Sequence, residues 1–166
     1  MKLYIKQKAF SWKDRFKVYD ENEQVRYYAE SDSALSFTKR LHLYAIDGTE
    51  VALVKSKPWS FLPRYEVFRG GEDGEKIFEV VGKWGLHSDY TLDGLGMKIE
   101  GSLSGMDYII TDLGHVICSI HKKRMSWSDT YEVEIEREED ERLAITVVLA
   151  IDAALAAAAA AAAAAT

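Results

Sequence analysis

The chain has 166 residues, of which 48% are apolar and 29% charged, and these values are typical of one globular domain rather than a disordered protein. Its formal net charge of −6 argues against nucleic acid as a main partner, because binding to a phosphate backbone requires a broad basic surface. The negative charge is concentrated in residues 132–141, where Arg137 is the only base, so a local basic patch elsewhere stays compatible with the total.

Most of the chain alternates apolar and polar residues with a period of two, and this pattern predicts β-strands. Turn-forming pairs such as Asp47-Gly48 and Asp93-Gly94 separate the runs. Because no amphipathic helix of ordinary length lies between them, we expect the strands to pair antiparallel. The expected strands centre on residues 16–19, 25–28, 41–44, 51–54, 65–68 and 131–135, with weaker runs at 77–81, 90–92, 97–99, 107–110 and 116–120.

A faint internal repeat relates residues 47–67 to residues 112–133. Each copy runs from a turn through a strand with basic residues and a Trp-containing connection to a further strand. A repeated antiparallel unit predicts a meander that closes on itself and thereby removes exposed sheet edges.

Residues 143–151 are apolar on every face of the expected C-terminal helix, so this segment is either buried on all sides or placed in lipid. The acidic residues 138–140 mark the start of the helix, and Asp140 is positioned to cap it. A membrane span is not expected, since the strongly apolar core has about half of the ~20 residues required. In addition, Asp152 follows that core at a cost of roughly 2.5–3.5 kcal/mol at a bilayer centre. We expect Asp152 to reach solvent or a hydrogen-bond partner near a rim of the fold.

Residues 156–165 are all alanine, a composition that favours helix. A run so uniform is interpreted as placeholder residues for a helix whose side chains were not identified, so its chemistry is given no weight. The expected organisation is therefore one domain over residues 1–155, with residues 156–166 continuing the C-terminal helix.

The order of these pieces resembles the bacterial members of the LURP-one-related family, which belongs to the tubby C-terminal-like superfamily and is related to phospholipid scramblases. The resemblance covers residues 1–155 and is carried by the segments at residues 1–8, 16–20, 41–44, 57–65 and 149–152. It implies a mainly β fold, a closed antiparallel β-barrel of about twelve strands around a central apolar C-terminal helix. The family includes a phosphoinositide-binding branch, scramblases and defence-linked plant proteins. This chain lacks the Cys-rich stretch and the separate membrane span expected of a scramblase.

The sequence contains no recognisable catalytic or metal-binding constellation, and no cofactor is expected. The four histidines include no closely spaced ligand pair; they are His42, His87, His115 and His121. Residues 101–105 resemble a nucleophile elbow, but Leu103 stands where the serine must be. The single cysteine, Cys118, lies in an apolar stretch and is predicted to be a buried thiol.

Basic residues at matching places of the two repeat copies are the first candidate binding site. Lys55 and Lys57 share one face of a strand, whereas Lys122 and Arg124 share a face in the second copy with Lys123 opposite. Such clusters would bind phosphate head groups, with each charge worth about 1 kcal/mol near an anionic membrane. The alternative is that they are edge-strand lysines that block sheet aggregation.

The loop at residues 59–63 is the second candidate surface and contains Trp59, Phe61, Leu62 and Pro63. Either it is an exposed apolar loop for a membrane or a protein partner, or its aromatic side chains cover an end of the barrel.

The predicted function is that of a non-enzymatic binding or scaffold protein. The leading hypothesis is reversible association with anionic phospholipid head groups through the basic strand positions. One alternative is a protein-interaction module that uses the loop at residues 59–63, and another is an enzyme whose site is not readable from the sequence. Charges recur every few residues at the N-terminus and leave no signal-peptide core, so we expect a cytoplasmic protein, peripheral at the membrane.

Overall fold

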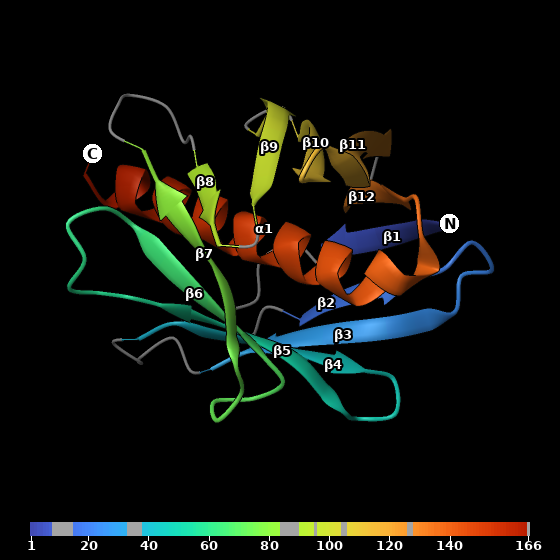
Figure 1. Cartoon of the computed structure of the whole chain (residues 1–166), viewed down its shortest axis with the longest axis horizontal. Coiled ribbons are helices and arrows are strands. Elements are labelled where there is room, and N and C mark those ends of the chain that lie inside the picture. Colours follow the sequence, from blue (N-terminus) through green and yellow to red (C-terminus); the bar gives the residue numbers. More distant parts are fainter. Residues whose placement is uncertain are drawn as a thin grey trace.

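The computed structural model describes residues 1–7, 15–32, 38–83, 90–94, 96–103, 106–125 and 128–165. In these segments twelve strands form one antiparallel sheet that curls around a single long helix (Figure 1). The predicted mainly β fold around the C-terminal helix is confirmed. The elements are β1 (Lys2–Gln7), β2 (Arg15–Tyr19), β3 (Val25–Ser31), β4 (Arg40–Ala45), β5 (Glu50–Ser56), β6 (Arg64–Arg69), β7 (Lys76–Gly82), β8 (Tyr90–Asp93), β9 (Met97–Ser102), β10 (Asp107–Asp112), β11 (His115–Met125), β12 (Ser128–Ile135), the 3₁₀ turn η1 (Glu138–Asp140) and α1 (Glu141–Ala164).

The strands follow chain order around the barrel, and the ring continues through a ladder between the first strand and the last. Within the described residues the order is β8-β7-β6-β5-β4-β3-β2-β1-β12-β11-β10-β9. The two edge strands, β8 and β9, are consecutive in the chain, but no ladder joins them among those residues. The barrel is therefore nearly closed rather than fully closed as expected.

The period-two pattern accounts for the two faces of each strand. In β3, Tyr27 and Ala29 point into the barrel and are buried, whereas Tyr28 and Glu30 alternate with them on the outer face. The turn between β4 and β5 illustrates how the strands are joined. There the Asp47 carboxylate accepts a hydrogen bond from the Thr49 N–H at 2.9 Å, and Gly48 adopts a φ of +86° that favours glycine.

The helix gives the barrel two distinct ends. We call the end where α1 begins the proximal end; there the Glu141 carboxylate accepts hydrogen bonds from the Arg26 guanidinium at 3.0 Å. At the opposite, distal end the Tyr90 hydroxyl donates to the Ala154 carbonyl at 3.0 Å. Because the strands alternate in direction, the β4–β5 turn lies at the proximal end and the β5–β6 loop lies at the distal end (Figure 1).

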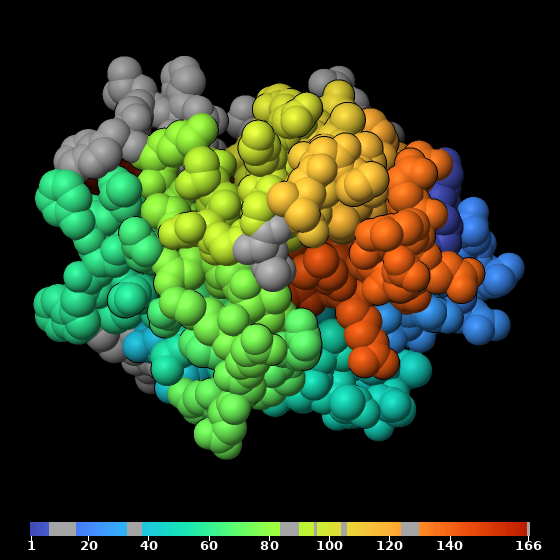
Figure 2. Space-filling model, in the orientation of Figure 1, coloured from blue at the N-terminus to red at the C-terminus, as the bar shows by residue number. Residues whose placement is uncertain are grey.

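The helix is enclosed on all sides over its middle. All nine residues from Ala144 to Asp152 are buried, which confirms that the apolar segment lies inside the barrel. Figure 2 shows strands and turns covering most of α1 from one side. Residues 138–164 are long and apolar enough to cross a membrane, with a mean hydropathy of 2.3, yet 56% of the most apolar stretch is buried inside the protein.

Several local expectations are corrected or confirmed. The strand β1 was absent from the predicted runs, because its lysines obscure the alternation of Leu3 and Ile5, which are buried. Asp140 precedes α1 but makes no capping hydrogen bond; its carboxylate instead accepts hydrogen bonds from the Arg137 guanidinium at 2.8 and 3.2 Å. The predicted burial of Cys118 is confirmed, since it is 0% exposed.

Candidate binding surfaces

The two basic pairs predicted from the repeat lie on opposite walls of the barrel. Lys55 belongs to β5 and Lys122 to β11, and six strand steps separate these strands in the twelve-strand order (Figure 1). The repeat copies are thus related by a half-turn around the barrel axis. The geometry does not bring the five predicted residues into one head-group site.

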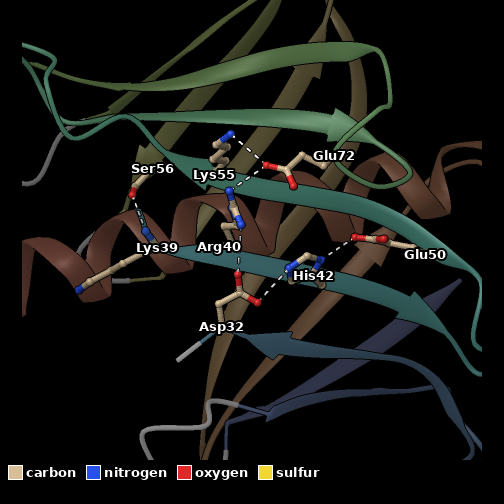
Figure 3. A network of polar contacts seen from close by, with 8 residues as sticks. All are labelled: Asp32, Lys39, Arg40, His42, Glu50, Lys55, Ser56 and Glu72. Carbon is tan, nitrogen blue, oxygen red and sulfur yellow. Dashed lines mark hydrogen bonds and ion pairs between the residues drawn. The ribbon is translucent and has the colours of Figure 1, made fainter. Parts of the chain in front are cut away.

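On the first wall, Lys55 is part of an ion-pair network over the outer face of β4 and β5 (Figure 3). Its ammonium lies 3.2 Å from the Glu72 carboxylate, which Arg40 also contacts at 2.8 Å. The Lys55 hydrogen bond, followed by the Arg40 charge, lowers the pKa of Glu72 below its usual value. Lys57 lies 3.6 Å from Glu66. Carboxylates therefore already contact both lysines of this pair.

An apolar residue that is not part of the barrel core lies beside the same network. Leu53 points outward between core residues Ala52 and Val54, yet it is 0% exposed. It lies opposite His42 in the ladder, and the two ring nitrogens of His42 contact Glu50 at 2.6 Å and Asp32 at 3.3 Å (Figure 3). This wall is explained as a set of cross-strand links that hold β3, β4, β5 and the β6–β7 loop together.

On the second wall, the register separates the predicted residues as their spacing indicated. Lys122 pairs with the inward residue Tyr131, whereas Lys123 pairs with Thr130 on the outer face. Lys123 forms an ion pair with Glu132, which also accepts a hydrogen bond from Lys2 at 2.9 Å. The Lys123 and Lys2 hydrogen bonds, in that order, lower the pKa of Glu132.

The last predicted basic residue, Arg124, follows Lys123 in the same strand. Its backbone continues the ladder of β11, where it pairs with Asp129. Its side chain lies outside the described residues, so its predicted role in a binding site stays a prediction.

A row of lysines on this wall was not predicted from the sequence. Lys6 lies directly opposite Lys17 in the β1–β2 ladder and opposite Thr130 in the β1–β12 ladder. Thr130 in turn lies opposite Lys123. The three lysines therefore form one outward-facing row across β2, β1, β12 and β11, about 14 Å long at the usual strand spacing. We call it the lysine row.

Tyrosine rings support two members of the lysine row. The Lys6 ammonium lies 4.6 Å from the centre of the Tyr19 ring, and the Lys123 ammonium lies 5.2 Å from the centre of the Tyr4 ring. Tyr4 and Tyr19 are themselves directly opposite each other. Cation–π attraction thus holds two ammonium groups above adjacent rings.

The β5–β6 loop at residues 57–63 presents its aromatic side chains to solvent. Trp59 is 87% and Phe61 83% exposed, so these two rings do not cover the end of the barrel. Leu62 is half-buried. The loop lies at the distal end, where α1 also emerges (Figure 1).

Charge is distributed unequally between the two ends. The proximal connections contain eleven acidic residues and Arg137 as one base: Asp20, Glu21, Glu23, Asp47, Glu72, Asp73, Glu75, Glu136, Glu138, Glu139 and Asp140. The described parts of the distal connections contain Lys39, Lys57 and Lys83 against Asp32. Among these described connections, the distal ones are therefore the less acidic.

Inside the barrel, Asp152 does not reach solvent, since it is 8% exposed. It lies close enough to Tyr108 for its charge to act on that hydroxyl group. Burial raises the pKa of Tyr108 well above its usual value, with smaller contributions from the charges of Cys118 and Asp152. No cluster of three metal-ligating side chains is present among the described residues.

Comparison with known proteins gives a consistent family and fold. The family model described as LURP-one-related matches residues 1–152. An uncharacterized protein of Bacillus subtilis, YxjI, is 33% identical over 136 residues, covering 81% of this chain and 82% of that protein. An Arabidopsis thaliana protein of known X-ray structure has the same fold, with a TM-score of 0.58 and 16% identity over 92% of this chain and 91% of that one.

Proposed function

Because this chain belongs to the LURP-one-related family, we propose that it is a non-enzymatic binding protein that associates reversibly with anionic phospholipid surfaces through its distal end. The family and its tubby-like fold agree with a binding role in general. The observation that carries the proposal is the pairing of two features at that end. The exposed rings of Trp59 and Phe61 lie at the end where lysines outnumber acids among the described connections. Acidic turns occupy the opposite end, so an anionic membrane would orient the barrel with its distal end facing the membrane surface.

The magnitudes favour weak, reversible binding. Each lysine near an anionic surface contributes about 1 kcal/mol, and burying an aromatic ring such as that of Phe61 contributes roughly 1.5–3 kcal/mol. Ordering the loop and losing motional freedom oppose these gains by several kcal/mol. The balance corresponds to dissociation constants in roughly the micromolar to millimolar range.

Vesicle co-sedimentation tests the proposal. The protein should sediment with vesicles that contain phosphatidylserine but not with pure phosphatidylcholine, and added salt should weaken binding by screening. The double variant Trp59→Ser, Phe61→Ser should lose most of this binding. The control is Leu113→Ser, because Leu113 is 82% exposed but lies in the proximal β10–β11 turn. Equal losses in the two variants would show that the distal end does not dock on the membrane.

A protein partner at the same loop is the second candidate, since exposed Trp and Phe side chains are also typical of protein-binding hot spots. The two candidates differ in their dependence on lipid. If the loop binds a protein, vesicles of either composition should leave the chain in solution, and the Trp59→Ser, Phe61→Ser variant should instead lose its co-purifying partner while Leu113→Ser retains it.

A further inference from the structure

We propose that the lysine row formed by Lys6, Lys17 and Lys123 is a binding site for a phosphate monoester dianion. The shared chemistry is the phosphate group, whether a lipid head group or a soluble phosphorylated compound carries it. The membrane source would place this site within the proposed function, whereas the soluble source would not require it.

The first argument is that the pairing of Lys6 with Lys17 opposes stability. Like charges that face each other directly across antiparallel strands destabilise a sheet. Neither lysine forms an ion pair with a carboxylate in the part of the chain that the structure describes. A ligand with negative charge would remove this repulsion.

The second argument is that sheet protection does not account for these lysines. Lysines that block aggregation belong on edge strands, where backbone groups are open to another chain. The edge strands of this barrel are β8 and β9, whereas β1 and β2 lie in the middle of the order with a ladder on each side. Blocking of sheet aggregation, which was considered for the basic residues at 55–57 and 122–124, therefore does not explain Lys6 and Lys17.

The third argument is preorganisation. The rings of Tyr19 and Tyr4 hold the Lys6 and Lys123 ammonium groups at 4.6 and 5.2 Å from the ring centres. Side chains that are held in place before binding lose less conformational freedom when the ligand arrives. Thr130, between Lys6 and Lys123 in the row, is 3% exposed and lies beneath them.

The charge of the wall matches a dianion. Among the side chains that the structure describes, the outward positions on β2, β1 and β12 and the row position on β11 carry Lys2, Lys6, Lys17 and Lys123 against Glu132 and Glu134. Four lysines against two glutamates leave an excess of two positive charges. A phosphate monoester near neutral pH carries up to two negative charges and three acceptor oxygens, so it can accept from several ammonium groups at once. A carboxylate ligand would leave one positive charge uncompensated.

Glu132 would act as an internal competitor at this site. Its carboxylate engages both Lys123 and Lys2, and a phosphate bound to Lys123 would lie near the same negative charge. Removing that charge should therefore tighten phosphate binding, an effect opposite to the one expected when a purely structural ion pair is lost.

The test is a titration of the intact chain with inorganic phosphate and with glycerol phosphate, followed by the amide shifts of β1 and β2 in ¹H–¹⁵N spectra. The double variant Lys6→Gln, Lys17→Gln should weaken binding at least about ten-fold, and Glu132→Gln should tighten it about two- to five-fold. Lys98→Gln, which removes an exposed lysine from β9, should leave the dissociation constant unchanged.

Vesicle sedimentation experiments distinguish a phosphate group carried by a lipid from one carried by a soluble compound. Stronger sedimentation with phosphatidate than with phosphatidylserine at equal charge, lost in Lys6→Gln, Lys17→Gln, identifies a lipid head group. Phosphate binding without this preference identifies a soluble ligand. If the Trp59→Ser, Phe61→Ser variant kept the vesicle binding of the parent, or if the parent bound no anionic vesicles, while the phosphate-induced shifts persisted, the membrane proposal alone would be overturned. Equal phosphate affinity in Lys6→Gln, Lys17→Gln and Lys98→Gln would overturn the site.

Discussion

The helix inside the barrel predicts a large stability difference between two chemically identical substitutions. Leu149→Ala removes a side chain that is 1% exposed at the middle of α1. Leu143→Ala makes the same change near the start of the same helix, where the side chain is half-buried. The intrinsic change in helix propensity is the same at both sites, so it cancels from the comparison.

The magnitude follows from what surrounds each site. A buried Leu→Ala change costs about 2–5 kcal/mol, and the cost rises with the cavity that the neighbours cannot fill. Strands joined by ladders surround α1 around nearly the whole circumference, so they cannot collapse into the space left by the Leu149 side chain without breaking backbone hydrogen bonds. We therefore expect about 4 kcal/mol at Leu149 and about 1–2 kcal/mol at Leu143. For a domain of this size, a loss of about 4 kcal/mol corresponds to a fall in Tm of roughly 8–16 °C.

Urea unfolding followed by circular dichroism and tryptophan fluorescence measures both values. The m-value should be the same in both variants, so that the difference in midpoint reports stability alone. Equal losses at the two positions, or a loss below about 1 kcal/mol at Leu149, would show that the barrel does not close tightly around the helix.

Three further predictions follow from burial, charge and backbone conformation. Burial raises the pKa of Cys118 to about 12, so at pH 8 only about one thiol in 10⁴ is ionised; a thiol reagent should react at the rate of unfolding, and fast labelling of the native protein would contradict this. Lys123 and Lys2 hold the pKa of Glu132 below its ordinary value of 4.5. Their contribution to the free energy of unfolding is therefore fully present above pH 4.5 and is lost as the pH falls through the pKa of Glu132 in the folded protein. Accordingly, Glu132→Gln should be less stable than the parent near neutral pH, and its stability should fall less steeply than that of the parent as the pH is lowered. Urea midpoints measured across pH test this. The same acid dependence in both proteins would refute the assigned role of Glu132. Finally, a Cβ at Gly101, with φ at +118°, would lie 2.6 Å from the Asp107 carbonyl oxygen, whereas one at Gly114, with φ at +86°, would meet nothing within 4 Å. Gly101→Ala should therefore lower the free energy of unfolding by more than the loss of about 1–2 kcal/mol expected for Gly114→Ala. Thermal unfolding should show this as a larger fall in Tm, and equal falls in Tm would contradict that geometry.

The sequence predicted the fold well because its signals are local. Alternation identified eleven of the twelve strands, and the apolar run before Asp152 identified a helix that must be enclosed. Parity within a strand also placed Lys122 and Lys123 on opposite faces, as their pairing with Tyr131 and Thr130 confirms. Each of these inferences depends only on residues a few positions apart.

The lysine row could not be predicted in the same way, because it depends on register between distant strands. Lys6 and Lys123 are brought together by the ladders of β12 with β1 and β11, and a shift of one residue in either ladder would turn one set of side chains to the other face. The repeat indicated two matching basic segments but not the half-turn that separates Lys55 from Lys122. Geometry of that kind is set by closure of the whole barrel and not by any local pattern.

The distribution of paired charges separates structural surfaces from candidate binding surfaces. Arg26 and Glu141 anchor the start of the helix, and Arg40, Glu72 and Lys55 link strands on the first wall. These contacts pair each charge within the protein, which weakens its attraction for a ligand, and the exposed pairs among them contribute little to stability. Lys6 and Lys17 combine the reverse features, since they face each other on central strands and make no carboxylate contact among the described residues. A fold selected only for stability would replace one of them, because a neutral residue there would remove repulsion at no cost in burial. Their side-by-side placement is thus better explained by what they bind than by what they hold together.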